Sequence, residues 1–357
     1  MPHLLIDISS HGFGHVAQTA PVLNALHALR PDVRMTVRTT APHSLLEQRI
    51  HFPFEHIPHT LDFGMRMHSA IEVDLANSAA DYRAFHTDWE ARVAHEAHAL
   101  DGLRPDLLLA NVPYLSLAAA QAASIPSVAL CSLNWSDIFG HYLAHDAEGQ
   151  RIHAVMQSAY RSALAFLKVE PAMPMSDLPN ARSLAPIVHT GHNRRDALTE
   201  KLKLSPDEKI VLSAMGGMDF RLPMECWPET PGLHWLIPKD WGIDRKDCTP
   251  FESLGIPFND LLASCDAVLT KPGYGTFAEA ACAGIPVLYA SRGDWPEQPY
   301  LVNWLERNGR CLEVSRPALK TGKEAVALLE ALWRMPVALR PNASGADEAA
   351  HYLSRLL

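Results

Sequence analysis

The sequence predicts an α/β protein with two doubly wound parallel sheets, each in a domain of its own. Two observations lead to this prediction. Strand and helix patterns alternate along the chain in two separate series, and a stretch rich in proline and short polar residues divides them. With 357 residues, 48% of them hydrophobic and 20% charged, the chain is long enough for two hydrophobic cores.

The first series predicts an amino-terminal domain over residues 1–172. Buried apolar runs mark its strands, which are expected at residues 4–9, 33–39, 106–110 and 127–131, and one long helix is expected at 78–100. Residues 173–189 are predicted to be a linker, because proline and short polar residues dominate their composition.

The second series predicts a carboxyl-terminal domain over residues 190–340. Its strands are expected at 209–214, 233–237, 267–270 and 286–290, and its helices at 259–264, 277–283, 298–307 and 322–334. A last helix is expected within residues 341–357, and whether it packs back on the first domain stays open.

A glycine-bearing turn between a strand and a helix, within Thr270 to Leu288 (TKPGYGTFAEAACAGIPVL), predicts an anion site. Gly273 and Gly275 are expected to let the backbone turn where a side chain would collide. The free N–H groups of the helix that opens near Thr276 then face a ligand, most simply a phosphate. Glu279 lies one turn further on, where its carboxylate suits the two hydroxyls of a ribose. An ordinary strand-turn-helix with a glycine cap is the alternative.

A second turn, Ser10-His11-Gly12-Phe13-Gly14-His15, follows the first strand at the sheet edge where open α/β folds bind ligands. His15 is expected near the start of the next helix, and its imidazole suits a general base at neutral pH. His11 is expected either to line the pocket or to support the loop. In a chain with 19 histidines, a purely structural role is the alternative for both.

The same turn matches G-x-G-x-x-A at Gly12, Gly14 and Ala17, which is a weak signal for a nicotinamide dinucleotide. Such a site normally has an acidic residue at the end of the second strand, but that strand ends at residues 37–40, VRTT. An NADP site that uses Arg38 is the remaining form of this alternative.

Charge and cysteine usage narrow the class of protein. The net charge of −9 and the lack of clustered Lys and Arg argue against a nucleic-acid surface. The six cysteines form no C-x-x-C pair, and the sequence shows neither a signal peptide nor an apolar run of about 18 residues. A cytoplasmic location is therefore expected, with peripheral membrane contact left open. No D-x-D motif occurs, so no metal is expected to hold a sugar diphosphate.

Two segments resemble the GT-B glycosyltransferases, namely HGFGHVAQTAPVLNAL and FNDLLASCDAVLTKPGYGTFAEAACAGIPVL. They are similar to the UDP-glycosyltransferase and family 28-like branch, and to the glycosyltransferase-like region of plant L-arabinokinases. The resemblance implies the GT-B fold, with two Rossmann-like domains facing each other across a cleft. It also implies that the second domain holds the donor nucleotide and the first holds the acceptor.

The resemblance implies roles for individual residues as well. His15 matches the catalytic histidine of the family, and Glu279 matches its ribose ligand. Contacts to the donor diphosphate are implied for Gly14, Gly216, Gly217, Gly273, Gly275 and Thr276, contacts to the donor sugar for Glu297 and Gln298, and contacts to the base for Ile256 and Phe258. The acceptor is expected to meet His11, Asn134 and Trp135, because amides and aromatic faces suit sugars.

The expected activity is an inverting, metal-independent transfer of a sugar from a nucleoside diphosphate sugar, with UDP as the expected nucleotide, to an acceptor hydroxyl. Inversion is favoured because retaining relatives carry two glutamates eight residues apart, whereas Val287 stands eight residues after Glu279. No cofactor is expected besides this co-substrate. Departures from the family's pattern, such as Lys271 before the glycine turn, keep other activities open. They are a nucleotide-sugar hydrolase, an epimerase and a non-catalytic nucleotide-sugar binding protein.

Overall fold

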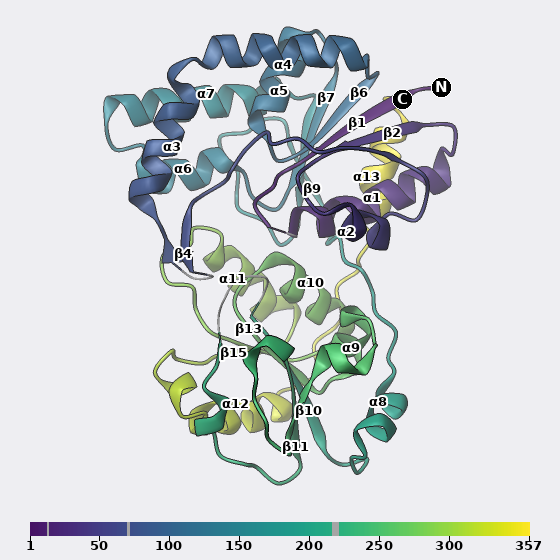
Figure 1. The fold of residues 1–357 in the computed structure, drawn as a ribbon, viewed down its shortest axis with the longest axis vertical. Coiled ribbons are helices and arrows are strands. Elements are labelled where there is room, and N and C mark those ends of the chain that lie inside the picture. The colour runs from purple at the N-terminus through teal and green to yellow at the C-terminus, as the bar shows by residue number, and fades with distance from the viewer. Residues whose placement is uncertain (13, 70–71, 216–220) are drawn as a thin grey trace. The chain divides into compact units, whose positions relative to one another are not determined.

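The computed structural model describes residues 1–12, 14–69, 72–215 and 221–357. Contacts between residues divide the chain into two compact units, each built on its own parallel sheet (Figure 1). Unit 1 consists of residues 1–68, 73–187 and 343–357, and unit 2 of residues 69–72 and 188–342. The α/β class expected from the two series of strands and helices is confirmed. Among the described residues, no helix has the length and apolar character needed to cross a membrane.

Unit 1 contains a seven-stranded sheet in the order β3-β2-β1-β6-β7-β8-β9, with parallel neighbours throughout. Strands β1, β6 and β7 are buried along their whole length, as expected at the centre of a parallel sheet. The strands are β1 (His3–Ile8), β2 (Arg34–Arg38), β3 (Glu55–Ile57), β6 (Leu107–Asn111), β7 (Ser127–Cys131), β8 (Ala165–Val169) and β9 (Ala181–Leu184). A separate short pair is formed by β4 (Met67–Ser69) and β5 (Glu72–Val73).

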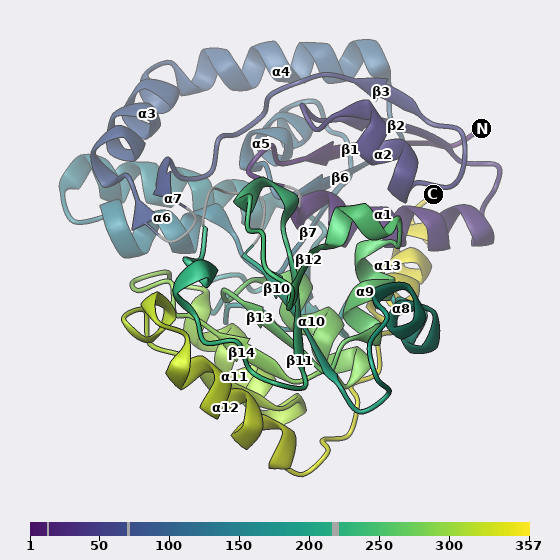
Figure 2. The same ribbon diagram turned by 60° about the horizontal axis from the view of Figure 1, so that its bottom comes forward.

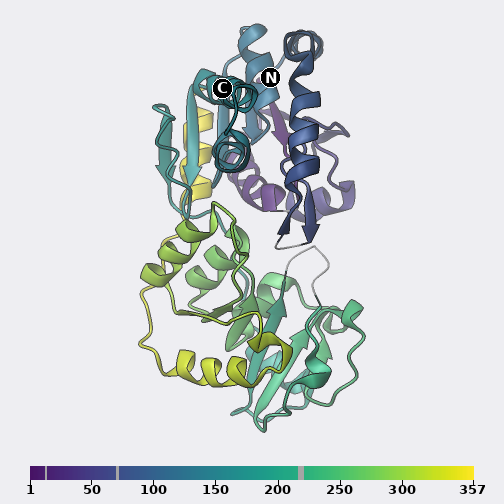
Figure 3. The same ribbon diagram turned by 90° about the vertical axis from the view of Figure 1, so that its left-hand side faces the viewer.

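The helices of unit 1 form two groups, and the helices of each group pack against one another. One group is α3 (Leu75–Thr87), α4 (Trp89–Leu103), α5 (Tyr114–Ala122), α6 (Trp135–Leu143) and α7 (Ala147–Ser162). The other is α1 (Gly14–Leu29), α2 (His43–Arg49) and α13 (Gly345–Ser354). The last helix of the chain thus packs along α1 and contacts β9, and Figure 3 shows it in yellow beside the strands of unit 1.

Unit 2 contains a six-stranded parallel sheet in the order β12-β11-β10-β13-β14-β15 (Figure 2). The strands are β10 (Lys209–Ala214), β11 (Leu233–Ile237), β12 (Cys248–Pro250), β13 (Ala267–Thr270), β14 (Val287–Tyr289) and β15 (Cys311–Glu313). The helices are α8 (Arg195–Leu202), α9 (Phe258–Ser264), α10 (Tyr274–Ala283), α11 (Gln298–Asn308) and α12 (Lys323–Arg334). Short 3-10 turns lie at Met224–Cys226, Lys239–Trp241, Phe251–Leu254 and Ala318–Lys320.

Successive residues of the central strands in unit 2 enter two different cores. Val211 and Leu269 pack into a core with α12, whereas Leu212 and Val268 pack into a core with α9, α10 and α11. Since side chains alternate between the faces of a strand, the sheet is covered on both sides. Figure 2 shows α12 on one side of this sheet and α8, α9 and α10 on the other.

Two expectations from the sequence differ from the structure. The helix expected at 78–100 is two helices, because Asp88 has φ −117° and ψ 47°, outside the helical range. The segment predicted as a linker, 173–189, contributes β9 to the edge of the first sheet. An edge strand has one solvated side, so its polar composition does not distinguish it from a linker. The chain passes from unit 1 to unit 2 at residues 187 and 188.

Candidate functional site

The carboxyl ends of β1 and β6 carry the candidate general base of unit 1. These two strands are neighbours in the sheet but distant in sequence, so their ends mark a switch point where doubly wound sheets bind ligands. His15 is the second residue of α1, as expected, and its Nδ1 lies 2.9 Å from Oδ1 of Asn111, the last residue of β6. The imidazole thus spans the switch point.

Hydrogen bonds around Asn111 fix the tautomer of His15. The Nδ2 group of Asn111 donates to Oγ1 of Thr19 at 2.9 Å, so Oδ1 of Asn111 accepts from Nδ1–H of His15. The lone pair of the ring is then on Nε2. Burial lowers the pKa of His15 to about 4, and the bond to Asn111 opposes that shift only in part. At pH 7 the ring is therefore neutral and able to accept a proton at Nε2.

The three residues expected to meet the acceptor have protein partners in unit 1. His11 packs its ring edge-on against Trp135, with 5.0 Å between the ring centroids. Trp135 is fully buried and donates its indole N–H to Asp62 at 2.7 Å. Asn134 is also buried, and its Oδ1 caps α6 by accepting from the N–H of Asp137 at 2.8 Å. The acceptor role of these residues stays a prediction.

The carboxyl end of β13 forms the corresponding place in unit 2. β13 lies beside β10 at the switch point of the second sheet, and Thr270 Oγ1 donates to Ala214 O at 2.6 Å. α10 follows directly, with Gly273 as its N-cap, and glycine has no side chain that could cap the helix. The N–H groups that open α10 are the donors expected to bind a phosphate. Gly216 and Gly217, expected to approach the diphosphate after β10, lie outside the described residues.

The reason predicted for the glycines at the start of α10 is wrong. Gly273 has φ −161°, an extended conformation open to any residue, and Gly275 lies inside the first turn of the helix. An added Cβ would meet only Lys271 O at 3.9 Å in the first case and no described atom within 4 Å in the second. The same holds for Gly14 at the start of α1. Against the described part of the chain these glycines avoid no collision, and they leave open space at the helix termini, which is what an approaching ligand requires.

Lys271, which lies between β13 and α10, adds positive charge beside the helix N-terminus. Burial and the nearby Arg292 together lower its pKa to about 8, and Glu297 acts in the opposite direction. The guanidinium of Arg292 lies 4.5 Å from the ring centroid of Trp295. An anion bound beside Lys271 would favour the charged ammonium, so nucleotide binding and the charge of this lysine are coupled.

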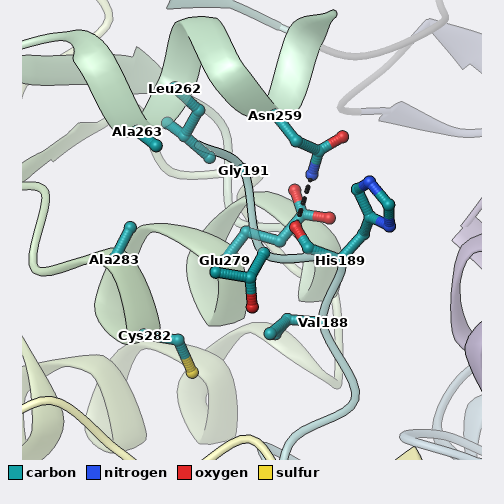
Figure 4. A pocket seen from close by; sticks show the side chains of 10 residues that line it. Val188, His189, Gly191, Asn259, Leu262, Ala263, Glu279, Cys282 and Ala283 are labelled. Atoms are coloured by element: carbon teal, nitrogen blue, oxygen red, sulfur yellow. Dashed lines mark hydrogen bonds between the residues drawn. The ribbon is translucent and has the colours of Figure 1, made fainter. Parts of the chain in front are cut away.

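Glu279 lies on α10 and lines a pocket between α9 and α10 (Figure 4). The first residues of unit 2 cover this pocket, because Asn259 Nδ2 donates to His189 O at 2.9 Å and Gly191 packs against Asn259. A Cβ on Gly191 would lie 1.9 Å from Asn259 O, so only glycine fits there. The cavity volume is about 10 Å³, which is room for about one water molecule and far smaller than a ligand site. Its lining comprises Val188, His189, Thr190, Gly191, Asn259, Leu262, Ala263, Glu279, Cys282 and Ala283.

The residues expected to contact the donor sugar and base are partly engaged within unit 2. Gln298 accepts from the N–H of Arg292 at 2.6 Å and donates to Ser291 Oγ at 2.8 Å, and Glu297 accepts from an indole N–H at 3.2 Å. Ile256 and Phe258 are half-buried and pack against the core beneath α9 and α10. These sugar and base contacts stay predictions.

Arg38, the cation of the alternative NADP site, is already paired with carboxylates of unit 1. Arg38 is buried, and its guanidinium donates to both oxygens of Asp7 at 2.7 and 2.6 Å and to Glu96 at 2.6 Å. A guanidinium held by two carboxylates is not available to a 2′-phosphate. Glu96 is only 3% exposed, because it belongs to this ion cluster.

Four polar residues around the two switch points were missed in the sequence. Asn111 ends a predicted strand, but only the order of strands in the sheet shows that it meets His15. Asp62 lies in an irregular segment without a periodic signal, and His189 belongs to the predicted linker. Asn259 follows Phe258, an apolar residue that was assigned a base contact, and was itself given no role. Of the four, only Asn111 had a signal in the sequence that could have found it, because it is a polar residue at the end of a strand.

Comparison with known proteins supports the fold. No family model matches the chain. It is 26% identical over 364 residues to an L-arabinokinase of Arabidopsis thaliana, which covers 97% of this chain and 33% of that protein. The chain therefore spans about a third of the length of this relative.

Among solved structures, the chain is similar to the glycotransferase of kitacinnamycin, with a TM-score of 0.63, 16% identity and coverage of 100% of this chain and 99% of the other. It is also similar to Arabidopsis thaliana UGT89C1 complexed with UDP, with a TM-score of 0.58, 16% identity and coverage of 99% and 94%. A putative UDP-N-acetylglucosamine 2-epimerase from Listeria monocytogenes gives a TM-score of 0.56 at 16% identity, with coverage of 99% and 94%. These likenesses show that the chain has the GT-B fold.

Proposed function

We propose that this protein is a glycosyltransferase that moves a sugar from a nucleoside diphosphate sugar to an acceptor hydroxyl. The observation that carries the proposal is the bond between His15 and Asn111, which holds a neutral imidazole at the switch point of unit 1. The opening of α10 at Gly273 and the charge of Lys271 beside it support a nucleotide donor site in unit 2. Similarity to a plant enzyme complexed with UDP supports UDP as the nucleotide.

The proposed reaction is an inverting displacement without a metal ion. Nε2 of His15 takes the proton from the acceptor hydroxyl while the hydroxyl oxygen bonds to the anomeric carbon of the donor sugar. The bond from that carbon to the diphosphate oxygen breaks on the opposite face, and the electron pair leaves with the diphosphate. The N–H groups that open α10 and the ammonium of Lys271 would stabilise this developing charge, which is the task of a metal in other transferases. Glu297 and Gln298 are the proposed contacts to the sugar.

A cytoplasmic location is part of the proposal. It is supported by the six cysteines, all within the described residues, none of which forms a disulfide.

Glu279→Ala is expected to abolish stabilisation by the donor nucleotide. A ligand at about 100 times its dissociation constant stabilises the folded protein by roughly 2.7 kcal/mol, which a thermal melt detects. We expect UDP, or another nucleoside diphosphate, to raise the Tm of the wild-type protein but not of this variant. Glu324→Ala, an exposed carboxylate of α12, is the matched control and should respond like the wild type. A rise with NADPH and none with any nucleoside diphosphate would contradict the proposed donor.

Asn111→Asp is expected to move the pH dependence of the reaction. A carboxylate beside His15 favours the imidazolium and so raises the pKa of the ring. Since only the neutral ring accepts a proton, the acid limb of kcat/KM should move to higher pH by at least about one unit. Asn111→Ser removes the amide without adding charge, and its acid limb should not rise. An unmoved limb in Asn111→Asp would show that the titration of His15 does not govern the rate.

A sugar-nucleotide epimerase or hydrolase is the second candidate, favoured by the similarity to a putative 2-epimerase. Such enzymes need no acceptor hydroxyl from a second substrate. Analysis of products from a sugar nucleotide, with and without a panel of acceptors, separates the activities. A new glycoside supports the transferase, whereas an epimerised sugar nucleotide, or free sugar with the nucleoside diphosphate, supports the alternatives. Donor returned unchanged under all conditions supports a binding protein.

A further inference from the structure

Asp62 is a buried carboxylate in the irregular segment that precedes α3, and it receives hydrogen bonds on both oxygens. Oδ1 accepts from Ser9 Oγ at 2.8 Å and from Ser10 N–H at 3.4 Å, and Oδ2 accepts from the indole N–H of Trp135 at 2.7 Å. Only 4% of the residue is exposed. A carboxylate taken out of water is costly unless such donors hold it, so its retention at this position needs an explanation.

The partners of Asp62 belong to the two elements that surround His15. Ser9 and Ser10 begin the turn from β1 to α1, and Ser9 Oγ also accepts the N–H of His11 at 3.2 Å. Trp135 begins α6, and its ring lies 5.0 Å from that of His11 and 5.9 Å from that of His15, centroid to centroid. One carboxylate therefore joins two parts of the structure: the turn, which carries His11 and leads to His15 in α1, and the ring of Trp135, which packs against both histidines.

The neighbouring segment is shaped to bring Asp62 to this place. Gly64 has φ +63°, in the left-handed region that favours glycine, and a Cβ there would lie 2.6 Å from His11 Cγ and 2.7 Å from Trp135 Cη2. The Phe63 carbonyl accepts from His11 Nδ1 at 3.3 Å. The segment thus fits closely against the face that His11 and Trp135 present to it.

His15 has no direct carboxylate partner among these groups, because its Nδ1–H is bonded to the amide of Asn111. An amide orients the ring but does little to fix the turn that precedes it. We propose that Asp62 is a positioning residue for the transfer. It holds the β1–α1 turn and Trp135 so that His15 stays aimed at the acceptor hydroxyl. The kinetic part of this inference rests on the proposed function. Burial raises the pKa of Asp62 to about 6, partly offset by its three hydrogen bonds, which agrees with a carboxylate kept in the interior by its donors.

Two variants of Asp62 test this role, because one removes the hydrogen bonds of its side chain and the other keeps most of them. Asp62→Ala removes every bond to the turn and to Trp135, and we expect kcat to fall about 100-fold, the loss associated with a misplacement of about 1 Å. The affinity for the donor nucleotide, which unit 2 binds in the proposal, should not change. Asp62→Asn keeps an oxygen for the indole N–H and a donor for Ser9 Oγ, so kcat should recover to within about fivefold of the wild type. Asp101→Ala, an exposed carboxylate of α4, is the control.

A second measurement is independent of turnover. In the full-length labelled protein, the imidazole resonances of His11 and His15 and the indole N–H resonance of Trp135 report the placement directly. We expect all three to shift in Asp62→Ala and to stay close to their wild-type positions in Asp62→Asn. If Asp62→Ala is too unstable to study, Ser9→Ala removes the hydroxyl that joins the turn to Asp62, leaves the ring of Trp135 in place and should shift both histidines.

The outcomes distinguish this inference from the proposed function. Histidine resonances that do not move in Asp62→Ala, or a kcat within threefold of the wild type, would overturn the positioning role. A wild-type protein that transfers no sugar to any acceptor would instead overturn the proposed function, while the resonance shifts would still decide what Asp62 holds.

Discussion

His15→Ala is expected to lower kcat by about 10² to 10⁴-fold, the range that a positioned general base contributes. The ring is oriented by Asn111 with its lone pair on Nε2, and burial keeps it neutral at pH 7, so no other described histidine shares its situation at the switch point. Turnover of a sugar nucleotide with an acceptor, measured at saturating concentrations of both, checks the prediction. The Tm shift caused by the donor nucleotide should be unchanged, because the proposed donor site lies in unit 2.

The pH dependence of the wild-type reaction supplies a second check on the same residue. The pKa of His15 is lowered to about 4, and protonation removes the base, so activity should persist as the pH falls below 6.5 and decline only near 4. His351→Ala, an exposed histidine of α13, is the control and should retain full activity. If activity in His15→Ala survived within about tenfold of the wild type, another group or water would be the base.

Arg38→Met is expected to destabilise the fold strongly, lowering the free energy of unfolding by about 3–5 kcal/mol. Arg38 is the common partner of Asp7 and Glu96, all three are almost completely buried, and His59 adds a further bond to Glu96 at 3.2 Å. Without the guanidinium, two carboxylates remain in the interior without their counter-charge. For a unit of this size the loss corresponds to a fall in Tm of roughly 10 °C.

The sign of the pH dependence distinguishes this mechanism from a simple loss of packing. Unpaired buried carboxylates in Arg38→Met would have raised pKa values, so their protonation would favour the folded state at low pH. The deficit of the variant relative to the wild type should therefore shrink as the pH falls from 7 toward 5. Arg334→Met, which breaks an exposed pair with Glu330 on α12, is the control and should cost less than about 1 kcal/mol. A deficit that is the same at both pH values would point to lost packing instead.

The parts of the fold that depend on strong local patterns were predicted well. β7 and β10 have the predicted bounds, and β13 and α10 occupy the predicted strand-turn-helix, because continuous apolar runs next to glycine or proline specify them locally. The position of His15 at the start of α1 follows from the same kind of signal. β9 escaped prediction because an edge strand carries no apolar run, and the break at Asp88 depends on a single pair of backbone angles.

The candidate site was less predictable, since it depends on contacts between segments far apart in sequence. Asn111 meets His15 only because β6 is placed beside β1, and Asp62 reaches Trp135 through a segment without regular structure. The position of Glu279 on a pocket follows from the helix, whereas the segment around His189 that covers the pocket does not. Periodicity specifies elements, and the arrangement of the elements then brings the chemical groups together.

The packing of α13 against α1 affects how this protein must be made. Unit 1 is discontinuous, because its last helix follows the whole of unit 2 in sequence, and Arg30 Nη1 also bonds to Ser354 O at 3.4 Å. During synthesis, the apolar side of α1 emerges from the ribosome early, more than 300 residues before the helix that covers it. Since domains otherwise fold in the order of their synthesis, unit 1 stays incomplete until both unit 2 and α13 have been synthesised.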